Sequence, residues 1–435
     1  MSFDQAAALT VLLVVIAALI WGKLRSDVVA LAGAAALLGL GVIRPIEAQG
    51  AFASPALLAL ASLFVIAYAM ELSGLLGAMI RLGIRMSRRL GAAGIWIMIT
   101  VCGGASAFLN NTPIVVLAAP VIRDVALSQG LAPQRFLIPL SYVTILGGAC
   151  TLIGTSTNLL VNDMARSSGQ PAFSLFEITP VALVVAVAGG LYLLVAAPRL
   201  LRGRDNEGGS LSKAIEQVAA SSEGPVGDAT LFADPPPLDL KRALASVGVF
   251  VAVVLVAALG YAPIAAAAFT GAVVLILTRV ITADEAYRGL RPEILLLIAG
   301  MVVVGLSLEV SGLAALATDA LTSFVEDLGP WVALAILYGV TLLLTEVLSN
   351  AAVAVLLTPL AVALAESLGV SPRPFMIAVM LAASAAFATP FGYQTNVLVY
   401  QLGRYSYMDF VRIGLPLNLL TWVVGVVAIP KFFPF

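Results

Sequence analysis

The sequence LNNTPIVVLAAP, residues 109–120, decides the fold of this chain, because its pattern recurs at LSNAAVAVLLTP, residues 348–359. Each copy places small polar residues in the middle of a long apolar run. Asn111 of the first copy corresponds to Asn350 of the second, 239 positions later. Apolar helices interrupted at corresponding places in two halves of a chain are typical of secondary transporters, in which the interruptions form the binding site.

A second pair of interruptions follows the first and supports the same repeat. GTSTN at residues 154–158 corresponds to GYQTN at residues 392–396, at an offset of 238. Further matches at offsets of 238 or 239 are Pro120 with Pro359, Pro133 with Pro372, Phe136 with Phe375, and ELSG at Glu71 with EVSG at Glu309.

The composition places the chain in a membrane. Hydrophobic residues make up 61% of its 435 residues and charged residues only 11%, whereas soluble proteins keep roughly a quarter of their residues charged. The net charge of −1 gives no reason to expect nucleic-acid binding. Because there is no histidine for a conventional catalytic triad and no phosphate-binding loop, we expect no enzymatic activity and no organic cofactor.

The apolar runs predict an all-α polytopic membrane protein. A spanning helix needs about 20 apolar residues, so the runs at 93–126 and 330–365, with a polar turn in the middle, are too long for one helix. We interpret both as re-entrant hairpins, whose irregular tips are tolerated only inside protein or a wet cavity. The other runs lie near 7–22, 28–43, 55–75, 134–162 and 178–198, and near 243–258, 262–281, 293–316, 373–401 and 410–430.

Five spanning helices and one hairpin in each half make the second repeat inverted relative to the first. The first repeat is expected to cover residues 1–202 and the second residues 241–435. Residues 203–240 are rich in Gly, Ser, Asp and Pro, a composition that does not fold alone, so we expect a cytoplasmic linker there. The unwound helix of each repeat is expected at about 134–162 and about 373–401.

The basic residues test this topology independently. With the N-terminus outside, 19 of the 23 lysines and arginines fall on the cytoplasmic side, in agreement with the positive-inside rule. We therefore expect a multi-pass protein of the plasma (bacterial inner) membrane, with both termini outside. The basic residues left outside are Arg44, Arg166, Arg373 and Lys431.

The repeated polar motifs contain no arginine or lysine, so an anion bound there needs another source of positive charge. The N-terminus of a broken helix carries roughly half a positive charge on its N–H groups. Freed carbonyl groups and the side-chain oxygens of Asn, Ser and Thr are hard ligands that suit a cation such as Na⁺. Taken alone, Asn110-Asn111 is typical of a helix cap. Four such elements in matching positions favour a binding site.

Three acidic residues within apolar runs allow more than one interpretation. Glu71 and Glu309 stand near the ends of their runs, which favours an interfacial structural role over proton transport. Glu346 lies four residues before Asn350 and can tune the hairpin, accept a proton or anchor the chain at an interface. The sequence leaves these roles open.

At these residues the chain resembles the divalent anion/sodium symporter (DASS) family of the ion transporter superfamily. That family carries Ser-Asn-Thr at two hairpin tips, where this chain has Asn110-Asn111-Thr112 and Ser349-Asn350-Ala351. Each triplet departs at one position and keeps the central asparagine. The segments LIGTSTNLLV (152–161) and ATPFGYQTNVLV (388–399) are similar to those of the family's sulfate-type permeases.

The resemblance implies a homodimer whose transport domain moves against a fixed scaffold in an elevator motion. It also implies two or more sodium ions, each between a hairpin tip and the neighbouring unwound helix. Carried over by position, the first sodium site is Ser106, Asn111, Gly154 and Asn158, and the second is Thr345, Asn350, Ala388 and Asn396. The anion would contact Asn110, Asn111, Thr112, Thr155, Ser349, Asn350, Thr389 and Pro390.

The predicted function is sodium-coupled symport of a small divalent anion. Sulfate is placed ahead of a dicarboxylate, because short side chains suit a compact tetrahedral anion. An alternative is an antiporter of the same superfamily that exchanges Na⁺ for H⁺ or exports a metalloid oxyanion, with Glu346 as proton acceptor. A sensor or channel is disfavoured, because paired repeats favour alternating access.

Overall fold

The computed structural model describes residues 2–21, 24–53, 55–75, 77–78, 90–201, 237–258, 261–290, 292–313, 329–346, 348–390 and 392–435. Within these ranges every regular element is a helix and no strand occurs. The predicted linker at 203–240 lies almost entirely outside the described residues, as does the side chain of Glu309. The prediction of an all-α fold is confirmed.

Two helical hairpins carry the repeated asparagines. The first consists of α6 (Ala92–Ser106) and α7 (Asn111–Ser128), and the second of α17 (Gly329–Thr345) and α18 (Asn350–Ser367). Side chains cap the second helix of each hairpin: Asn110 accepts from the backbone N–H of Thr112, and Ser349 from that of Ala352. Each asparagine of the repeat is therefore the first residue of a helix.

The helix that follows each hairpin is broken. In the first half α8 (Gln134–Gly148) and α9 (Ser156–Ser167) are separated by residues 149–155. In the second half α19 (Arg373–Ser384) and α20 (Gln394–Gly403) lie further apart in the sequence, and the described residues between them, 385–390, 392 and 393, form a longer irregular segment. Both breaks lie where the sequence predicts unwound helices, although α9 extends five residues beyond the expected end at residue 162.

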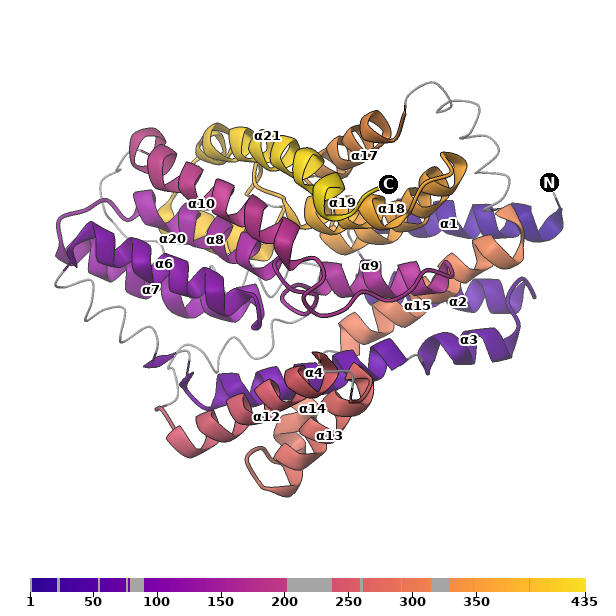
Figure 1. The fold of residues 1–435 in the computed structure, drawn as a ribbon, viewed down its shortest axis with the longest axis horizontal. Coiled ribbons are helices and arrows are strands. Elements are labelled where there is room, and N and C mark those ends of the chain that lie inside the picture. Colours follow the sequence, from indigo (N-terminus) through magenta and orange to yellow (C-terminus); the bar gives the residue numbers. More distant parts are fainter. Residues whose placement is uncertain are drawn as a thin grey trace.

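Figure 1 shows two layers, with the hairpins and broken helices in the upper one. Below them α4 (Pro55–Leu72) packs with α12 (Leu240–Ala258), α13 (Ile264–Leu277) and α14 (Ala283–Gly289). This lower layer has its own apolar core, which includes Ile66. The larger core includes Leu60 of α4 and joins the upper layer with α1 (Phe3–Trp21), α2 (Ser26–Gly39), α3 (Pro45–Phe52), α10 (Thr179–Leu200), α15 (Pro292–Val310) and α21 (Tyr407–Phe432).

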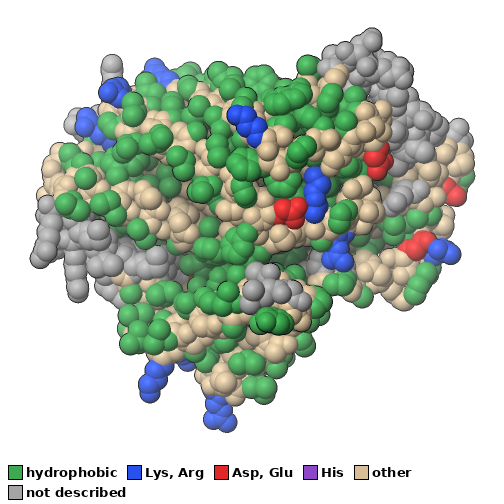
Figure 2. All heavy atoms as spheres, in the orientation of Figure 1, with side chains coloured by type: hydrophobic (Ala, Val, Ile, Leu, Met, Phe, Trp, Pro, Cys, Tyr) green, Lys and Arg blue, Asp and Glu red, His purple; other side chains and the backbone are tan. Residues whose placement is uncertain are grey.

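Six helices among the described residues are long and apolar enough to cross a membrane. Hydrophobic side chains cover much of the face in Figure 2, and charged side chains are few. The predicted polytopic membrane protein is confirmed. Because α7 and α18 are themselves among the six, length alone does not decide whether the hairpins turn back within the bilayer. The re-entrant hairpins, the inverted repeats and the sidedness stay predictions.

Candidate functional site

The tip of the first hairpin brings together a hydroxyl and an amide five residues apart. Ser106 Oγ donates a hydrogen bond to Asn111 Oδ1, and both side chains are buried. Asn110 Oδ1 accepts from the N–H of Thr112 at 3.3 Å, so Asn110 is both a helix cap and a residue at the tip. The cap expected from the sequence is therefore compatible with the predicted site.

The tip of the second hairpin repeats this pair with Thr345 and Asn350. Thr345 Oγ1 donates to the carbonyl oxygen of Ala383 at 2.7 Å. With its nitrogen turned toward them, the Asn350 amide donates to Thr345 Oγ1 at 2.8 Å, Ala383 O at 3.2 Å and Gly392 O at 3.3 Å. Three oxygens thus face one amide. If the amide turns over, Asn350 Oδ1 becomes the fourth oxygen of a set that suits a hard cation.

The irregular segment of each half is tied to the tip of its own hairpin by a threonine. Thr151 Oγ1 donates to the carbonyl oxygen of Ala107 and accepts from the N–H of Gly154 at 3.1 Å. Thr389 Oγ1 donates to the carbonyl oxygen of Glu346 at 3.2 Å and accepts from the N–H of Gly392 at 3.1 Å. We call residues 106–111 with 149–155 the first half-site, and residues 345, 346 and 348–350 with 383–390, 392 and 393 the second half-site.

Glycine is required at the centre of the first half-site. A Cβ atom on Gly154 would lie 2.3 Å from the carbonyl oxygen of Gly148 and 2.9 Å from that of Ala107. A Cβ atom on Gly148 would lie 2.6 Å from Asn111 Oδ1. These approaches are closer than van der Waals contact, so only glycine lets the carbonyl oxygens converge beside the asparagine.

The spacing shared by the two repeats also places an asparagine just after each irregular segment. Asn158 Nδ2 donates to the carbonyl oxygen of Thr151 at 2.9 Å, and Asn396 Nδ2 donates to that of Ala386 at 2.8 Å. The Asn396 Oδ1 atom accepts from Ser141 Oγ at 2.7 Å. The Asn158 Oδ1 atom is buried and has no hydrogen-bond partner among the described residues. An orphaned buried oxygen of this kind is a candidate cation ligand.

Hydrogen bonds between the halves join the two half-sites. Asn111 Nδ2 donates to the hydroxyl of Tyr393 at 2.9 Å, and Thr112 Oγ1 donates to Gln394 Oε1 at 3.1 Å. Ser141 of α8 contacts Thr395 and Asn396 of α20. The first hairpin therefore contacts the second broken helix directly, although the partners are 282 positions apart.

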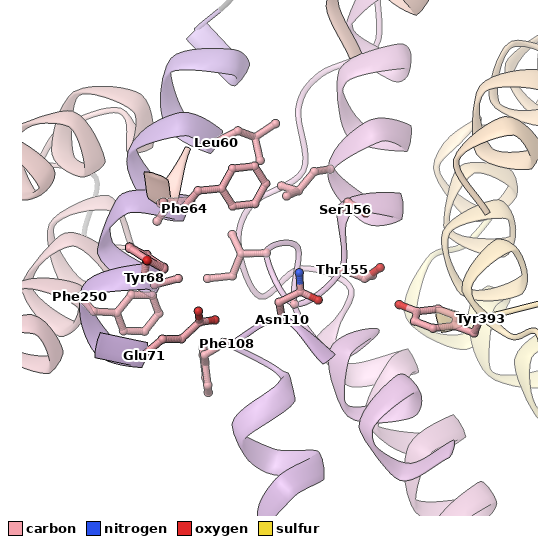
Figure 3. Close-up of a pocket in the computed structure, with 16 residues that line it drawn as sticks. Leu60, Phe64, Tyr68, Glu71, Phe108, Asn110, Thr155, Ser156, Phe250 and Tyr393 are labelled. Carbon is pink, nitrogen blue, oxygen red and sulfur yellow. The ribbon is translucent and has the colours of Figure 1, made fainter. Parts of the chain in front are cut away.

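A cavity lies where the first half-site faces the lower layer. Its empty volume is about 750 Å³, including its open mouth. Asn110, Thr155 and Tyr393 approach it from the upper layer, and Glu71 of α4 approaches from the lower layer (Figure 3). Among the lining residues that the structure describes there is no lysine or arginine. Two helix N-termini reach the cavity, because Asn110 caps α7 and Thr155 caps α9.

Glu346 has a different setting, in the second half-site. Its Oε1 atom accepts from the N–H groups of Phe387 at 2.9 Å and Ala388 at 2.7 Å, and from Asn418 Nδ2 at 2.6 Å. Its Oε2 atom accepts from the N–H of Thr389 at 2.8 Å. Both carboxylate oxygens thus have donors, three of which are backbone N–H groups of the irregular segment.

The predicted site residues fall into three groups. Those expected to bind sodium lie within their own half-sites, with Asn158 and Asn396 just beyond the irregular segments. Asn110 and Thr155 line the cavity. Among the residues expected to touch the anion, Ser349 caps α18, Thr389 binds Glu346, and Pro390 is buried in the same segment. Whether these residues bind ions or an anion stays a prediction.

The sequence reasoning missed several polar residues of the site. Tyr393 and Gln394 directly precede the repeated Thr-Asn pair. Because they are polar residues within an apolar stretch, they could have been predicted to belong to the site. Asn418 is likewise a lone amide inside the long apolar helix α21. Glu71, whose role the sequence left open, is buried and lines the cavity.

The chain is similar to known transporters. The sequence profile of the citrate transporter family (CitMHS) matches residues 16–370. An uncharacterised transporter of Synechocystis sp. is 26% identical over 91% of this chain and 91% of its own length. Sodium/sulfate cotransporter 1 of Chlamydomonas reinhardtii is 34% identical over 155 residues, which are 35% of this chain and 18% of that protein.

A solved structure shares the fold. The YdaH transporter of Alcanivorax borkumensis superposes with a TM-score of 0.57 over 88% of this chain and 86% of its own, at 15% identity. The predictions of a transporter and of the absence of enzymatic function are confirmed by the family and its relatives. Because the family profile covers most of the chain, the chain belongs to the citrate transporter (CitMHS) family, within the ion transporter superfamily that includes the divalent anion/sodium symporters.

Proposed function

We propose that this transporter carries a small divalent anion together with sodium, with sulfate as the favoured anion and a dicarboxylate next. The observation that carries the proposal is the pairing of two oxygen-rich hairpin tips with a cavity whose described lining residues include no basic side chain. The names of similar proteins agree, since sodium/sulfate cotransporter 1 and a sodium-dependent dicarboxylate transporter are among them.

Because no lysine or arginine is among the described lining residues, helix N-termini are the source of positive charge for recognition of the anion. Asn110 and Thr155 cap α7 and α9 at the cavity, so the partial positive charges of both helices point to one place. The side chains of Asn110 and Thr155 add short polar contacts. This arrangement suits a compact oxyanion better than a long polycarboxylate, which favours sulfate.

The oxygen sets of the half-sites support sodium as the coupling ion. In the second half-site Thr345, Ala383 and Gly392 supply three oxygens, and Asn350 supplies a fourth when its amide turns over. In the first, Ser106, Asn111 and the orphaned oxygen of Asn158 fit the same role. Placing a bare dianion within a membrane has a large free-energy cost. Two sodium ions that cancel its charge lower the free energy needed to move the loaded site across the membrane. Binding of ions and anion then favours each other by the same factor.

The division into two layers supports an elevator motion. The cavity lies between the lower layer and the hairpin tip, so movement of one layer along the other would carry the loaded site across the membrane. An apolar cleft between α12 and α13, whose exposed lining includes Ala252 and Val274, is a place where a second copy would pack in the expected homodimer. We place the protein in the plasma membrane with the segment between the repeats in the cytoplasm.

The test is uptake of radiolabelled sulfate into proteoliposomes that contain the purified chain. An inward sodium gradient should drive accumulation, and replacement of sodium by choline should abolish it. Unlabelled thiosulfate, succinate and citrate, added separately, rank the anions by competition. Uptake that is unchanged in choline would refute sodium coupling, and competition by succinate but not by thiosulfate would make the anion a dicarboxylate.

The antiporter alternative has one observation in its favour. It needs a titratable group in the pathway, and Glu71 lines the cavity. Glu71 is therefore a candidate proton acceptor beside Glu346. Proton release from proteoliposomes on addition of sodium, absent in Glu71→Gln, would favour exchange of Na⁺ for H⁺ over symport.

A further inference from the structure

The two half-sites differ at one position, occupied by Ala107 in the first and Glu346 in the second. The positions are equivalent in the repeat, 239 residues apart. They are also equivalent in three dimensions, because the carbonyl oxygen of each accepts a hydrogen bond from the threonine of its irregular segment, Thr151 or Thr389. A methyl group in one half therefore stands where a carboxylate stands in the other.

The carboxylate changes the backbone around it. In the first half the N–H groups of Ala149 and Cys150 bond back to carbonyl oxygens of α8, at 3.1 and 3.0 Å. The matching groups in the second half belong to Phe387 and Ala388, and they bond to Glu346. As a result α19 ends at Ser384, and the irregular segment that follows it is longer than its counterpart in the first half.

The fourth donor to the Glu346 carboxylate comes from α21, where Asn418 donates to Glu346 Oε1. One helical turn before Asn418, a Cβ atom on Gly414 would lie 1.9 Å from the carbonyl oxygen of Phe387. Glycine at 414 thus lets α21 approach the irregular segment closely enough for Asn418 to reach the carboxylate. The three N–H groups and the amide form an anion-binding cradle that the chain fills with its own side chain.

The cradle adjoins the oxygen set of the second half-site. Glu346 follows Thr345 in sequence, and its Oε2 atom would lie 3.5 Å from a Cβ atom on Gly392. Thr345 and Gly392 both contribute oxygens to the set around Asn350. A fixed negative charge this close to a partly buried site attracts a cation strongly, because the surrounding protein screens charge less than water does.

We propose that Glu346 is a built-in counter-anion, so that the second half-site binds sodium without the transported anion while the first half-site requires that anion. The inference rests on the proposed function, because it assumes that both half-sites take a cation. Ala107 offers no charge, and the cavity beside the first half-site is where the transported anion supplies it. Sodium therefore loads the second half-site first, and the anion and the other sodium follow together.

The test uses the purified full-length chain in lipid nanodiscs without sulfate or a dicarboxylate. Thermal unfolding is followed while sodium gluconate replaces choline gluconate, since gluconate is too large for the cradle. The wild type should be stabilised in a saturable way. Glu346→Ala should need at least tenfold more sodium for half-maximal stabilisation, and formate, which returns a carboxylate to the emptied cradle, should restore the response to within threefold.

Glu177→Ala is the matched control, because it removes a carboxylate that pairs with Arg373 at 2.9 Å away from the half-sites. Its sodium response should equal the wild type with or without formate. The inference is overturned if folded Glu346→Ala responds to sodium like the wild type, or if formate does not restore a lost response. If Glu346→Ala does not fold, Glu346→Asp must keep the sodium response and Glu346→Gln must lose it, and equal behaviour of the two overturns the inference.

These outcomes are distinguishable from failure of the proposed function. If the wild-type chain responds to sodium but takes up no anion, the proposed symport is refuted and the role of Glu346 as counter-anion stands. If Glu346→Ala keeps an unchanged sodium response, only the role of Glu346 as counter-anion is refuted. If the wild type shows no sodium response, both the counter-anion and the proposed symport are refuted.

Discussion

Asn111 Nδ2 donates a hydrogen bond to the Tyr393 hydroxyl at 2.9 Å, and this bond joins the first hairpin tip to the second broken helix. Asn111 also accepts from Ser106 within its own half-site. One amide is thus shared between the predicted first sodium site and a residue that borders the second. If Asn111 binds a cation, its hydrogen bond to Tyr393 in the second half-site would change as well.

The Tyr393→Phe variant should weaken this communication with little loss of stability. Removing one hydroxyl costs about 1 kcal/mol, so the melting temperature should fall by only a few degrees. Sodium dependence of uptake should become less cooperative, with a Hill coefficient closer to one. Tyr192→Phe, which loses a hydroxyl bonded to Ile413 O at 3.1 Å outside the half-sites, is the control and should keep wild-type cooperativity.

Asn111→Ala and Asn350→Ala should each abolish sodium-driven uptake while the protein still folds. Each loses an oxygen from a half-site, and the expected cost in stability is about 1–3 kcal/mol. Asn162→Ala is matched to them, since Asn162 Oδ1 accepts from the N–H of Phe173 at 2.7 Å outside the half-sites. Uptake at the wild-type rate in either half-site variant would remove the site assignment.

Gly154→Ala should impair both folding and transport. The added Cβ would lie 2.3 Å from the carbonyl oxygen of Gly148, so the first half-site must distort to accept it. Gly190→Ala offers the contrast, because a Cβ there meets nothing within 4 Å and alanine favours a helix by about 1 kcal/mol. Thermal unfolding should show destabilisation for the first variant and none for the second. Equal melting temperatures would contradict the close packing of the half-site.

Glu71→Gln should increase the affinity for the transported anion several-fold. The carboxylate lines the cavity, and removing a negative charge there reduces repulsion of a dianion. The half-saturating sulfate concentration at saturating sodium measures the effect. Glu47→Gln, whose carboxylate pairs with Arg44 at the protein surface, should leave that concentration unchanged. A lower affinity in Glu71→Gln would mean that Glu71 supports binding rather than opposing it.

Anions should stabilise the protein only when sodium is present. Ligands that bind the folded state raise its stability with the logarithm of their excess over the dissociation constant. A thermal-shift series with sulfate, thiosulfate, succinate and citrate, each in sodium and in choline, tests this. Equal shifts in both salts would separate anion binding from sodium and contradict the proposed coupling.

The helix interruptions were predictable because their causes are local. Asn110, Ser349 and Thr155 bond to backbone groups two or three residues away, and Gly154 permits a backbone path that other residues block. Such effects depend on neighbours in the chain, and the repeat at 238 or 239 positions made them visible twice. The membrane fold was predictable for a similar reason, since a composition this apolar indicates a protein surface that faces lipid rather than water.

The partners of these residues were not predictable in the same way. The residues near Glu346 in the sequence do not predict that its carboxylate accepts hydrogen bonds from the backbone of residues 387–389. Likewise, the residues near Glu71 do not predict that it lines the cavity. Asn111 and Tyr393 meet only because the first hairpin packs against the broken helix of the second half. Local residue chemistry sets where a helix starts and stops, whereas contacts between distant segments depend on how all the helices pack at once.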